Sequence, residues 1–414
     1  MTFPGVVRRA SLNRLRFLAI MVLLLGILVS PAPATEPSPY PKFIAGEEFF
    51  IPGRPLVVYI TAQPRFTAIE NDSRNKIDNH FFGWRRLKLR LLGNPLPQLT
   101  YCFQGVYKTH NFSPTDNRVT LQEAWVQWKL LPYFRVKVGQ TLPPMGFERF
   151  TPDEMLFSIE RSLPTDSLIP NGKLGDSFAR DYGVLASGFF SGPKLGYDLA
   201  LMGGNGANEG HLLQRGSYLL VGRLTWQPYR LPQDGIDLQL GGAMSFRRNH
   251  DLDLRQQLPG SGKLGYQHFN GRDYHYNIFL TLDKGPFSLR SEGFWARYHS
   301  CRPGLPSLSA LGYYVQAAYF LHPRLQAVAK YEYFDPNEAL HNSQDLRWTT
   351  LGLNLYLVGN QVKLAANYIF KNERTGGIHN DTFIVQLFFF FGYPHNPRLE
   401  SWDFLRSSRH RGAS

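Results

Sequence analysis

Polar and apolar residues alternate along much of this chain, and the stretch GWRRLKLRLLG at residues 83–93 shows the pattern clearly. Arg86, Lys88 and Arg90 alternate there with leucines at positions 87, 89 and 91. A period of two belongs to a β-strand, so the cations line one face and the leucines line the other. For one strand alone, a half-buried place in the sheet of a soluble protein explains this pattern equally well. The other strands and their connections must show whether the protein is soluble or of another class.

Sixteen stretches of this kind follow one another, each separated from the next by a turn or a loop. Most are about ten residues long, which suits a tilted strand that crosses a bilayer. We predict strands over Leu56–Ala68, Trp84–Leu91, Leu99–Tyr107, Thr120–Leu130, Phe134–Gly139, Arg180–Phe189, Gly196–Gly203, Tyr218–Tyr229, Ile236–Arg247, Tyr274–Lys284, Phe287–Tyr298, Leu311–Leu321, Arg324–Phe334, Leu346–Val358, Gln361–Lys371 and Thr382–Phe391.

The connections between these stretches alternate in length. Short links such as Gly285–Pro286 and Gly359–Asn360 follow even-numbered strands, whereas longer links such as Gln140–Ala179 and Arg248–Asp273 follow odd-numbered strands. Bacterial outer-membrane barrels have short periplasmic turns and longer outer loops. The sequence therefore predicts an all-β fold, a transmembrane antiparallel β-barrel of sixteen strands with both termini in the periplasm.

The cost of placing charge in lipid decides which face of each strand points outward. An Arg or Lys that faces lipid near the bilayer midplane costs roughly 2–4 kcal/mol, so the cations should face the lumen. By this parity we predict inward cations at Arg65, Arg86, Lys88, Arg90, Arg135, Lys137, Arg223, Arg290, Lys330 and Lys363. The same parity predicts inward acids at Glu123, Asp237, Glu292 and Glu332. Aromatic residues near strand ends predict a lipid-facing girdle that includes Trp226, Tyr229, Trp295 and Tyr298.

The ends of the chain predict export. Four arginines precede the apolar run Phe17–Val29, and Ala32 and Ala34 then occupy the small-x-small positions of a cleavage site. We predict a signal peptide over residues 1–34, a periplasmic lead-in over 35–54, the barrel over 55–391 and a basic tail over 392–414. An uncleaved membrane anchor is the alternative, but the apolar run is short for a spanning helix.

Charge narrows the range of partners. The formal net charge is +13, and subtracting the four leader arginines leaves +9 for the remaining chain. A basic chain attracts nucleic acid, anionic lipid or anionic solutes. Export argues against nucleic acid, and the sequence has no nucleic-acid-binding motif. Cys102 and Cys301 are too few for a disulfide scaffold, and the sequence leaves their pairing open. No His/Cys cluster has metal-ligand spacing, so we expect no metal and no cofactor.

The segment Leu121–Ser162 resembles the phosphate-selective porin O and P family. The resemblance rests on a Leu-x-x-Ala strand with Gln127 and Lys129, on Val138-Gly139-Gln140, and on Glu160-Arg161. The stretch RDYGVLASGFFSGPKLGYDLALMGGNG (Arg180–Gly206) resembles the family's Arg-Asp-x-Gly strand, and later segments resemble it more diffusely: Tyr331–Asn337 and Leu351–Phe370.

This resemblance implies a trimeric channel in the outer membrane of a Gram-negative bacterium. Its long third loop, here Gln140–Ala179, is expected to fold into the lumen and to bring Arg149 and Arg161 to the constriction. The expected partners are small anions such as phosphate, the outer-membrane lipid, and two further copies of the chain. The last strand ends at Phe391, which resembles a signal for the barrel-assembly machinery.

Two other functions stay open. A general or sugar-permeable porin would use inward aromatic residues, predicted at Trp125, Trp348 and Tyr356, for stacking. An outer-membrane enzyme would need a nucleophile activated by a base, but neither Gly-x-Ser-x-Gly nor His-Glu-x-x-His occurs. The sequence therefore predicts a passive, anion-preferring diffusion porin rather than an enzyme.

Overall fold

The described part of the chain consists of sixteen strands and two short helices. The computed structural model describes residues 54–70, 80–109, 117–171, 179–208, 216–231, 236–252, 254, 258, 269–340, 342–375 and 380–393, all of which belong to one compact unit. The predicted signal peptide lies outside these residues, as do most of the predicted lead-in and tail. Within the described ranges, no helix is both long and apolar enough to cross a membrane.

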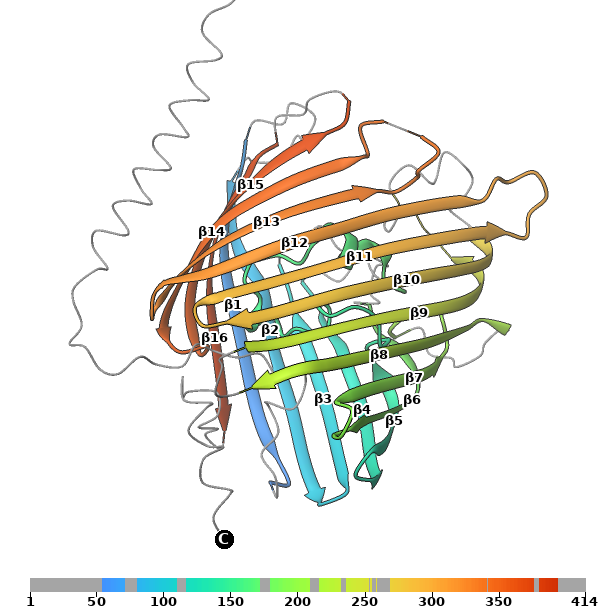
Figure 1. The fold of residues 1–414 in the computed structure, drawn as a ribbon, viewed down its shortest axis with the longest axis horizontal. Coiled ribbons are helices and arrows are strands. Elements are labelled where there is room, and N and C mark those ends of the chain that lie inside the picture. The colour runs from blue at the N-terminus through green and yellow to red at the C-terminus, as the bar shows by residue number, and fades with distance from the viewer. Residues whose placement is uncertain are drawn as a thin grey trace, which may run out of the picture. The chain divides into compact units, whose positions relative to one another are not determined.

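The strands form one closed antiparallel barrel in which every strand pairs with its neighbours in sequence (Figure 1). The ring closes where β1 pairs with β16, from Val58 opposite Tyr393 to Ile69 opposite Thr382. This confirms the predicted fold class and the predicted strand number. The strands are β1 Val57–Ile69, β2 His80–Leu96, β3 Leu99–Tyr107, β4 Val119–Leu131, β5 Phe134–Thr141, β6 Asp181–Phe190, β7 Leu195–Met202, β8 Tyr218–Leu231, β9 Ile236–Leu252, β10 Phe269–Lys284, β11 Phe287–Ser300, β12 Leu308–His322, β13 Leu325–Asp335, β14 Leu346–Val358, β15 Val362–Glu373 and β16 Thr382–Tyr393.

Several strands continue beyond their predicted ends, mostly toward the long loops. The predicted loop Arg248–Asp273 is wrong at both edges, because β9 continues to Leu252 and β10 begins at Phe269. The polar residues of these edges remain in register, with Arg248 opposite Arg272 and Asn249 opposite Gly271. Ladder pairing therefore extends past the point where apolar alternation stops.

The two faces of the strands differ as the alternation predicts. On β2, Leu89 is 49% exposed, whereas the neighbouring Lys88 is 9% exposed. On β14 and β15 the same rule leaves Leu351 exposed and buries Asn354 and Asn367. In a closed barrel the buried, polar-bearing face is the inner one, and the exposed apolar face is the one that suits lipid.

The aromatic girdle is only partly as predicted. Trp226 and Trp295 are exposed on the outer face. The placement of Tyr298 in the girdle is wrong, because this residue is fully buried on the opposite face of β11, edge-to-face with Phe269 and His275. Tyr298 is three residues after Trp295, and residues an odd number apart on a strand point to opposite faces. Strict alternation would therefore have placed Tyr298 on the inner face. The side chain of Tyr229 lies outside the described residues.

The connection between β5 and β6 carries the two helices, η1 Asp153–Met155 and α2 Leu163–Leu168. We call residues 142–171 of this connection the β5–β6 segment. Helix α2 begins after Ser162, whose hydroxyl accepts a hydrogen bond from the backbone N–H of Thr165, and it packs against β11, β12 and β13. Buried residues on these and neighbouring strands hold the segment mostly through its backbone.

Over one arc of the barrel, apolar residues form a large cluster on the buried face, with polar and charged residues between them. Leu163 and Leu168 of α2 pack in a cluster with buried residues of β6 to β13, among them Met202, Val221 and Phe294. Burial by the segment explains why these strands bear apolar residues on the face that was predicted to be polar. The arc formed by β1, β2 and β14 to β16 is more polar on this face.

The two cysteines do not form a disulfide. Cys102 is buried, Cys301 is exposed, and both thiols are free.

Candidate functional site

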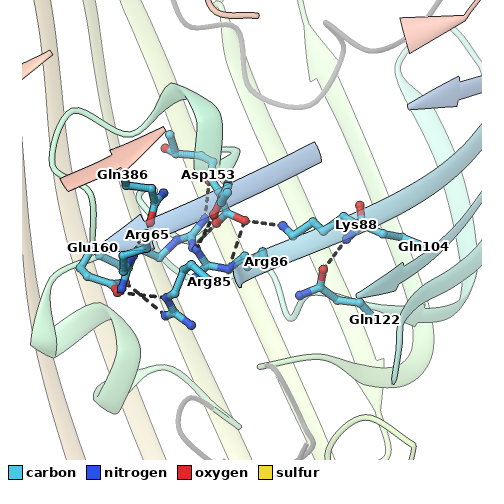
Figure 2. Close-up of polar contacts among 12 residues, drawn as sticks. Arg65, Arg85, Arg86, Lys88, Gln104, Gln122, Asp153, Glu160 and Gln386 are labelled. Carbon is cyan, nitrogen blue, oxygen red and sulfur yellow. Dashed lines mark hydrogen bonds and ion pairs between the residues drawn. The ribbon is translucent and has the colours of Figure 1, made fainter. Parts of the chain in front are cut away.

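A β-bulge places two consecutive arginines on the buried side of β2. Gln63 of β1 lies opposite Arg86, but the next residue, Pro64, lies opposite Trp84, so Arg85 is the extra residue. Proline has no N–H to donate to the ladder, which suits a bulge at this point. The side chains of Arg85 and Arg86 are only 17% and 12% exposed, and both face the β5–β6 segment (Figure 2).

Asp153, at the start of η1, is surrounded by three cations. Its Oδ2 lies 3.4 Å from Nε of Arg86 and also accepts a hydrogen bond from Nζ of Lys88. Its Oδ1 accepts a 2.6 Å hydrogen bond from Arg161, whose guanidinium also donates to the carbonyl oxygen of Thr151. One carboxylate therefore positions two cations of the wall and one cation of the segment.

Glu160 forms the second ionic centre of the site. It accepts hydrogen bonds from Arg65 on β1 and from Arg85 on β2, the latter with 3.0 Å between Nε and Oε1 (Figure 2). Arg65 also donates to Oε1 of Gln386 on β16, at 2.7 Å. This centre spans the closure of the barrel, because the three strands that contribute to it are β2, β1 and β16.

We use the name cation cluster for the six cations that pair with acids of the β5–β6 segment. Three acids partner them: Asp153, Glu160 and Asp166, the last 3.1 Å from Arg149. Six positive and three negative charges leave a net charge of +3. The cation cluster is Arg65, Arg85, Arg86, Lys88, Arg149 and Arg161.

The acids of the site are held in their charged form. Burial alone would raise the pKa of Asp153, but Arg86, Lys88 and Arg161 outweigh it and hold the pKa well below its usual value. The pKa of Glu160 is likewise held low, because Arg65 and Arg85 outweigh its burial. Both carboxylates therefore stay ionised at neutral pH.

Of the predicted inward and constriction cations, all except Arg290 and Lys330 are the ten expected to bind anions, and the structure brings five of these ten together: Arg65, Arg86, Lys88, Arg149 and Arg161. The other five lie elsewhere and have other contacts. Arg90 donates to Gln104, Lys137 lies 4.2 Å from the ring centre of Trp125, and Arg223 pairs with Asp198. Arg135 is half-buried on β5, opposite Ser187. Lys363 donates to the carbonyl oxygens of Glu154 and Leu156, at 2.8 and 2.9 Å.

Several wall residues bind the backbone of the β5–β6 segment. Glu292 on β11 accepts hydrogen bonds from the N–H groups of Phe147 and Glu148, at 2.7 and 2.6 Å. Further backbone contacts come from four more strands: His275 to Leu168, Lys330 to Glu160, Glu332 to Leu163, Asn354 to Phe157 and Asn367 to Ile159. Two residues that the parity rule assigned to the lumen as charges, Glu292 and Glu332, therefore act here as anchors of the segment.

The predicted inward aromatic residues do not present open faces. The ammonium groups of Lys137 and Lys371 lie 4.2 and 4.6 Å from the ring centres of Trp125 and Trp348. Tyr356 is 3% exposed, and its hydroxyl donates to Gln326. This arrangement does not favour sugar stacking at these three positions.

Sequence reasoning missed Arg85 and the pairing role of Asp153 and Glu160. Strict alternation assigns Arg85 to the outer face, and the one available signal was Pro64 on the neighbouring strand, which disfavours a regular ladder. Within the described ranges, no group of three or more His, Cys, Asp or Glu residues could hold a metal ion.

The fold and the site together define a class of protein. A closed barrel with an apolar outer face, charged inner residues and short turns alternating with long loops is an outer-membrane channel. The chain belongs to the phosphate-selective porin O and P family, whose family model matches residues 58–387. It is therefore a porin of the outer membrane of a Gram-negative bacterium.

Solved structures of other porins share the fold at low sequence identity. OmpF of Salmonella typhi, in complex with daunomycin, is 12% identical with a TM-score of 0.57, covering 82% of this chain and 98% of that one. An anion-selective porin from Comamonas acidovorans is 12% identical with a TM-score of 0.53 and the same coverage. OmpT of Vibrio cholerae, in trimer form, is 10% identical with a TM-score of 0.55, covering 81% and 99%. No curated protein matches the chain.

Proposed function

We propose that this porin is an anion-preferring diffusion channel that passes small anions such as phosphate or related oxyanions. The observation that carries the proposal is the net charge of +3 on the cation cluster and its paired acids. In this proposal the β5–β6 segment is the third loop of the family, folded into the lumen, and the channel is narrowest where the segment meets β1 and β2.

The chemistry of a narrow pore explains why such a cluster would select anions. A solute that enters loses water and needs donors or opposite charge in exchange. Arginine suits oxyanions because its planar guanidinium donates two parallel hydrogen bonds. Four of the six cations come from the wall and two from the segment, so an anion between them would meet positive charge on both sides.

The three acids support passage rather than opposing it. Each holds one, two or three cations in fixed positions, so little reorganisation is needed when an anion arrives. They also lower the total positive charge, which limits how tightly an anion is held. A channel requires binding that is favourable enough for entry and weak enough for exit.

The test is the reversal potential of the purified protein in a planar bilayer under a potassium chloride gradient, with phosphate then titrated in. The variant R85Q/R86Q/K88Q reduces the net charge of the cluster and its acids from +3 to zero. The matched control, R302Q/R324Q/R347Q, removes three exposed arginines that lie outside the cluster. We expect anion preference and block by phosphate in the wild type and the control, and loss of both in the cluster variant.

Each other result has a definite meaning. Anion preference without block by phosphate would make the protein a general anion porin. Cation preference in the wild type, or full anion preference in the cluster variant, would refute the proposed site. Swelling of liposomes in neutral sugars at rates that exceed those for anions of equal size would favour the sugar-porin alternative.

We also propose a homotrimer that is inserted by the barrel-assembly machinery. The trimer form of Vibrio cholerae OmpT, which shares this fold, supports that assembly. Cross-linking of the protein in native outer membranes should give a band at three times the mass of the chain, and only monomers after cross-linking would contradict it.

A further inference from the structure

Three outward-facing arginines cluster at the loop end of neighbouring strands. Arg248 on β9, Arg272 on β10 and Arg297 on β11 are all exposed. They belong to the same strand face as Met244, Tyr276 and Trp295, which are also exposed. That face is the outer one, so these arginines do not line the channel. We call them the outer arginine patch.

The register places these cations side by side. Arg248 lies directly opposite Arg272, and Arg272 lies directly opposite His299, which is two residues beyond Arg297 on the same face of β11. Directly opposite side chains on antiparallel strands have Cβ atoms about 4.5–5.5 Å apart, and diagonal ones about 7–8 Å apart. Like charges at such positions destabilise a sheet. No hydrogen bond or ion pair joins any of the three guanidinium groups to another described residue.

An aromatic band lies immediately beside the patch, toward the middle of the strands. The rings of Tyr218 and Phe246 are 5.7 Å apart, and those of Phe246 and Tyr274 are 5.2 Å apart. One step further along, Tyr276 stacks on Trp295 at 5.5 Å. Aromatic belts mark the boundary between hydrocarbon and headgroups in outer-membrane barrels. The outer arginine patch therefore lies at headgroup level, on the side of the long loops.

We propose that the outer arginine patch binds a phosphorylated lipid headgroup of the outer leaflet, with the acyl chains of that lipid lying over the aromatic band. Charge complementarity carries the inference. Cations near a membrane surface attract anionic headgroups, and guanidinium groups bind phosphate through paired hydrogen bonds. A bridging phosphate would also relieve the repulsion between Arg248 and Arg272. This site is separate from the channel, so it stands or falls independently of the proposed function.

The chain offers a matched control at the same end of the barrel. Arg347 on β14 is also exposed near a long loop, and it lies opposite Tyr333 and Asn372 rather than opposite another cation. Its guanidinium lies 6.0 Å from the ring centre of Tyr333. An isolated outward arginine beside an aromatic ring is therefore available for comparison with the cluster of three.

The experiment is native mass spectrometry of the folded, full-length protein in detergent, with diphosphorylated lipid A, dephosphorylated lipid A or inorganic phosphate added. We expect the wild type and R347Q to retain diphosphorylated lipid A, R272Q to retain less, and R248Q/R272Q/R297Q to lose at least about tenfold in apparent affinity. Dephosphorylated lipid A should bind all four proteins equally weakly. The heat-modified gel mobility of each variant shows whether the barrel is folded.

Three results would overturn the proposal. Equal retention of diphosphorylated lipid A by the triple variant and the wild type would show that the patch is not the site. Inorganic phosphate that binds as well as the lipid would identify an ion site without a lipid role. Loss of the oligomer in the triple variant without added lipid, read from the same spectra, would mean that a second copy of the chain covers the patch.

Discussion

Lys363 on β15 donates a 2.8 Å hydrogen bond to the backbone carbonyl oxygen of Glu154 in the β5–β6 segment. The same ammonium group donates to the carbonyl oxygen of Leu156, and the side chain is 1% exposed. Parity predicted an anion-binding residue at this position. Its contacts place it among the wall residues that hold the segment, and a role in binding anions stays a prediction.

The first prediction concerns this anchor. Lys363→Met should lower stability by about 1–3 kcal/mol, because two buried carbonyl groups lose their donor. It should increase open-channel current noise and leave the reversal potential nearly unchanged. Single-channel recording measures both quantities. Lys371→Met is the matched control, because Lys371 lies on the same face of β15 over the ring of Trp348. A large change of reversal potential in K363M would assign Lys363 to the anion path after all.

The second prediction concerns the acid at the centre of the cation cluster. Asp153→Asn should raise the net charge of the cluster and its acids from +3 to +4 and so increase the anion preference. It should also lower stability by about 3–5 kcal/mol, since three buried cations lose a shared partner. Reversal potential and thermal unfolding on heat-modifiability gels test the two effects. Glu160→Gln should act in the same direction. A fall in anion preference in either variant would contradict the charge argument.

The third prediction concerns pH. The pKa values of Asp153 and Glu160 are held well below their usual values of 3.8 and 4.5. A carboxyl group with a lowered pKa in the folded state stabilises the fold fully above its unfolded pKa, and this stabilisation is lost as pH falls toward the folded value. The difference in unfolding temperature between wild type and D153N should therefore stay constant from about pH 8 to pH 5 and shrink below about pH 4. A steady change of that difference across pH 5 to 8 would count against ionised carboxylates.

The fourth prediction concerns the backbone at the end of β5. Gly139 has φ +131°, and a β-carbon there would lie 2.2 Å from the carbonyl oxygen of Ala124. Gly139→Ala should therefore sharply reduce the amount of folded barrel, by a cost that exceeds the roughly 1–2 kcal/mol of a left-handed conformation alone. Gly192→Ala is the control, because nothing lies within 4 Å of a β-carbon built there. Heat-modifiable protein in outer-membrane fractions measures the yield, and equal yields would refute the steric argument.

The barrel could be predicted because its signals lie within short stretches of sequence. Alternation and loop length predicted sixteen strands, because a strand between lipid and a polar interior must present opposite characters on its two faces. Residues such as Lys88 and Lys363 follow this rule directly. The predictions failed where a residue's position depends on a neighbouring strand rather than on its own stretch of sequence. Alternation gives no sign of the extra residue at Arg85, and it stops short of the paired but polar end of β9.

The contacts of the β5–β6 segment were less predictable than the strands. The contacts of Asp153 and Glu160 depend on the path of a long connection, which has no periodicity to follow. For the same reason, parity could not separate cations that face other charges, such as Arg86, from those that hold carbonyl groups, such as Lys363. The apolar inner arc also depends on α2, which covers it.

The wall holds the β5–β6 segment largely by its main-chain groups, at Phe147, Glu148, Glu154, Leu156 and Ile159 among others. Every amino acid except proline offers the same N–H and carbonyl groups. Attachment at these points therefore does not depend on which side chains the segment carries, whereas attachment through Asp153 and Glu160 does. In engineering terms, the half-buried positions between these points can be redesigned while the barrel and the ion pairs of Asp153 and Glu160 stay unchanged.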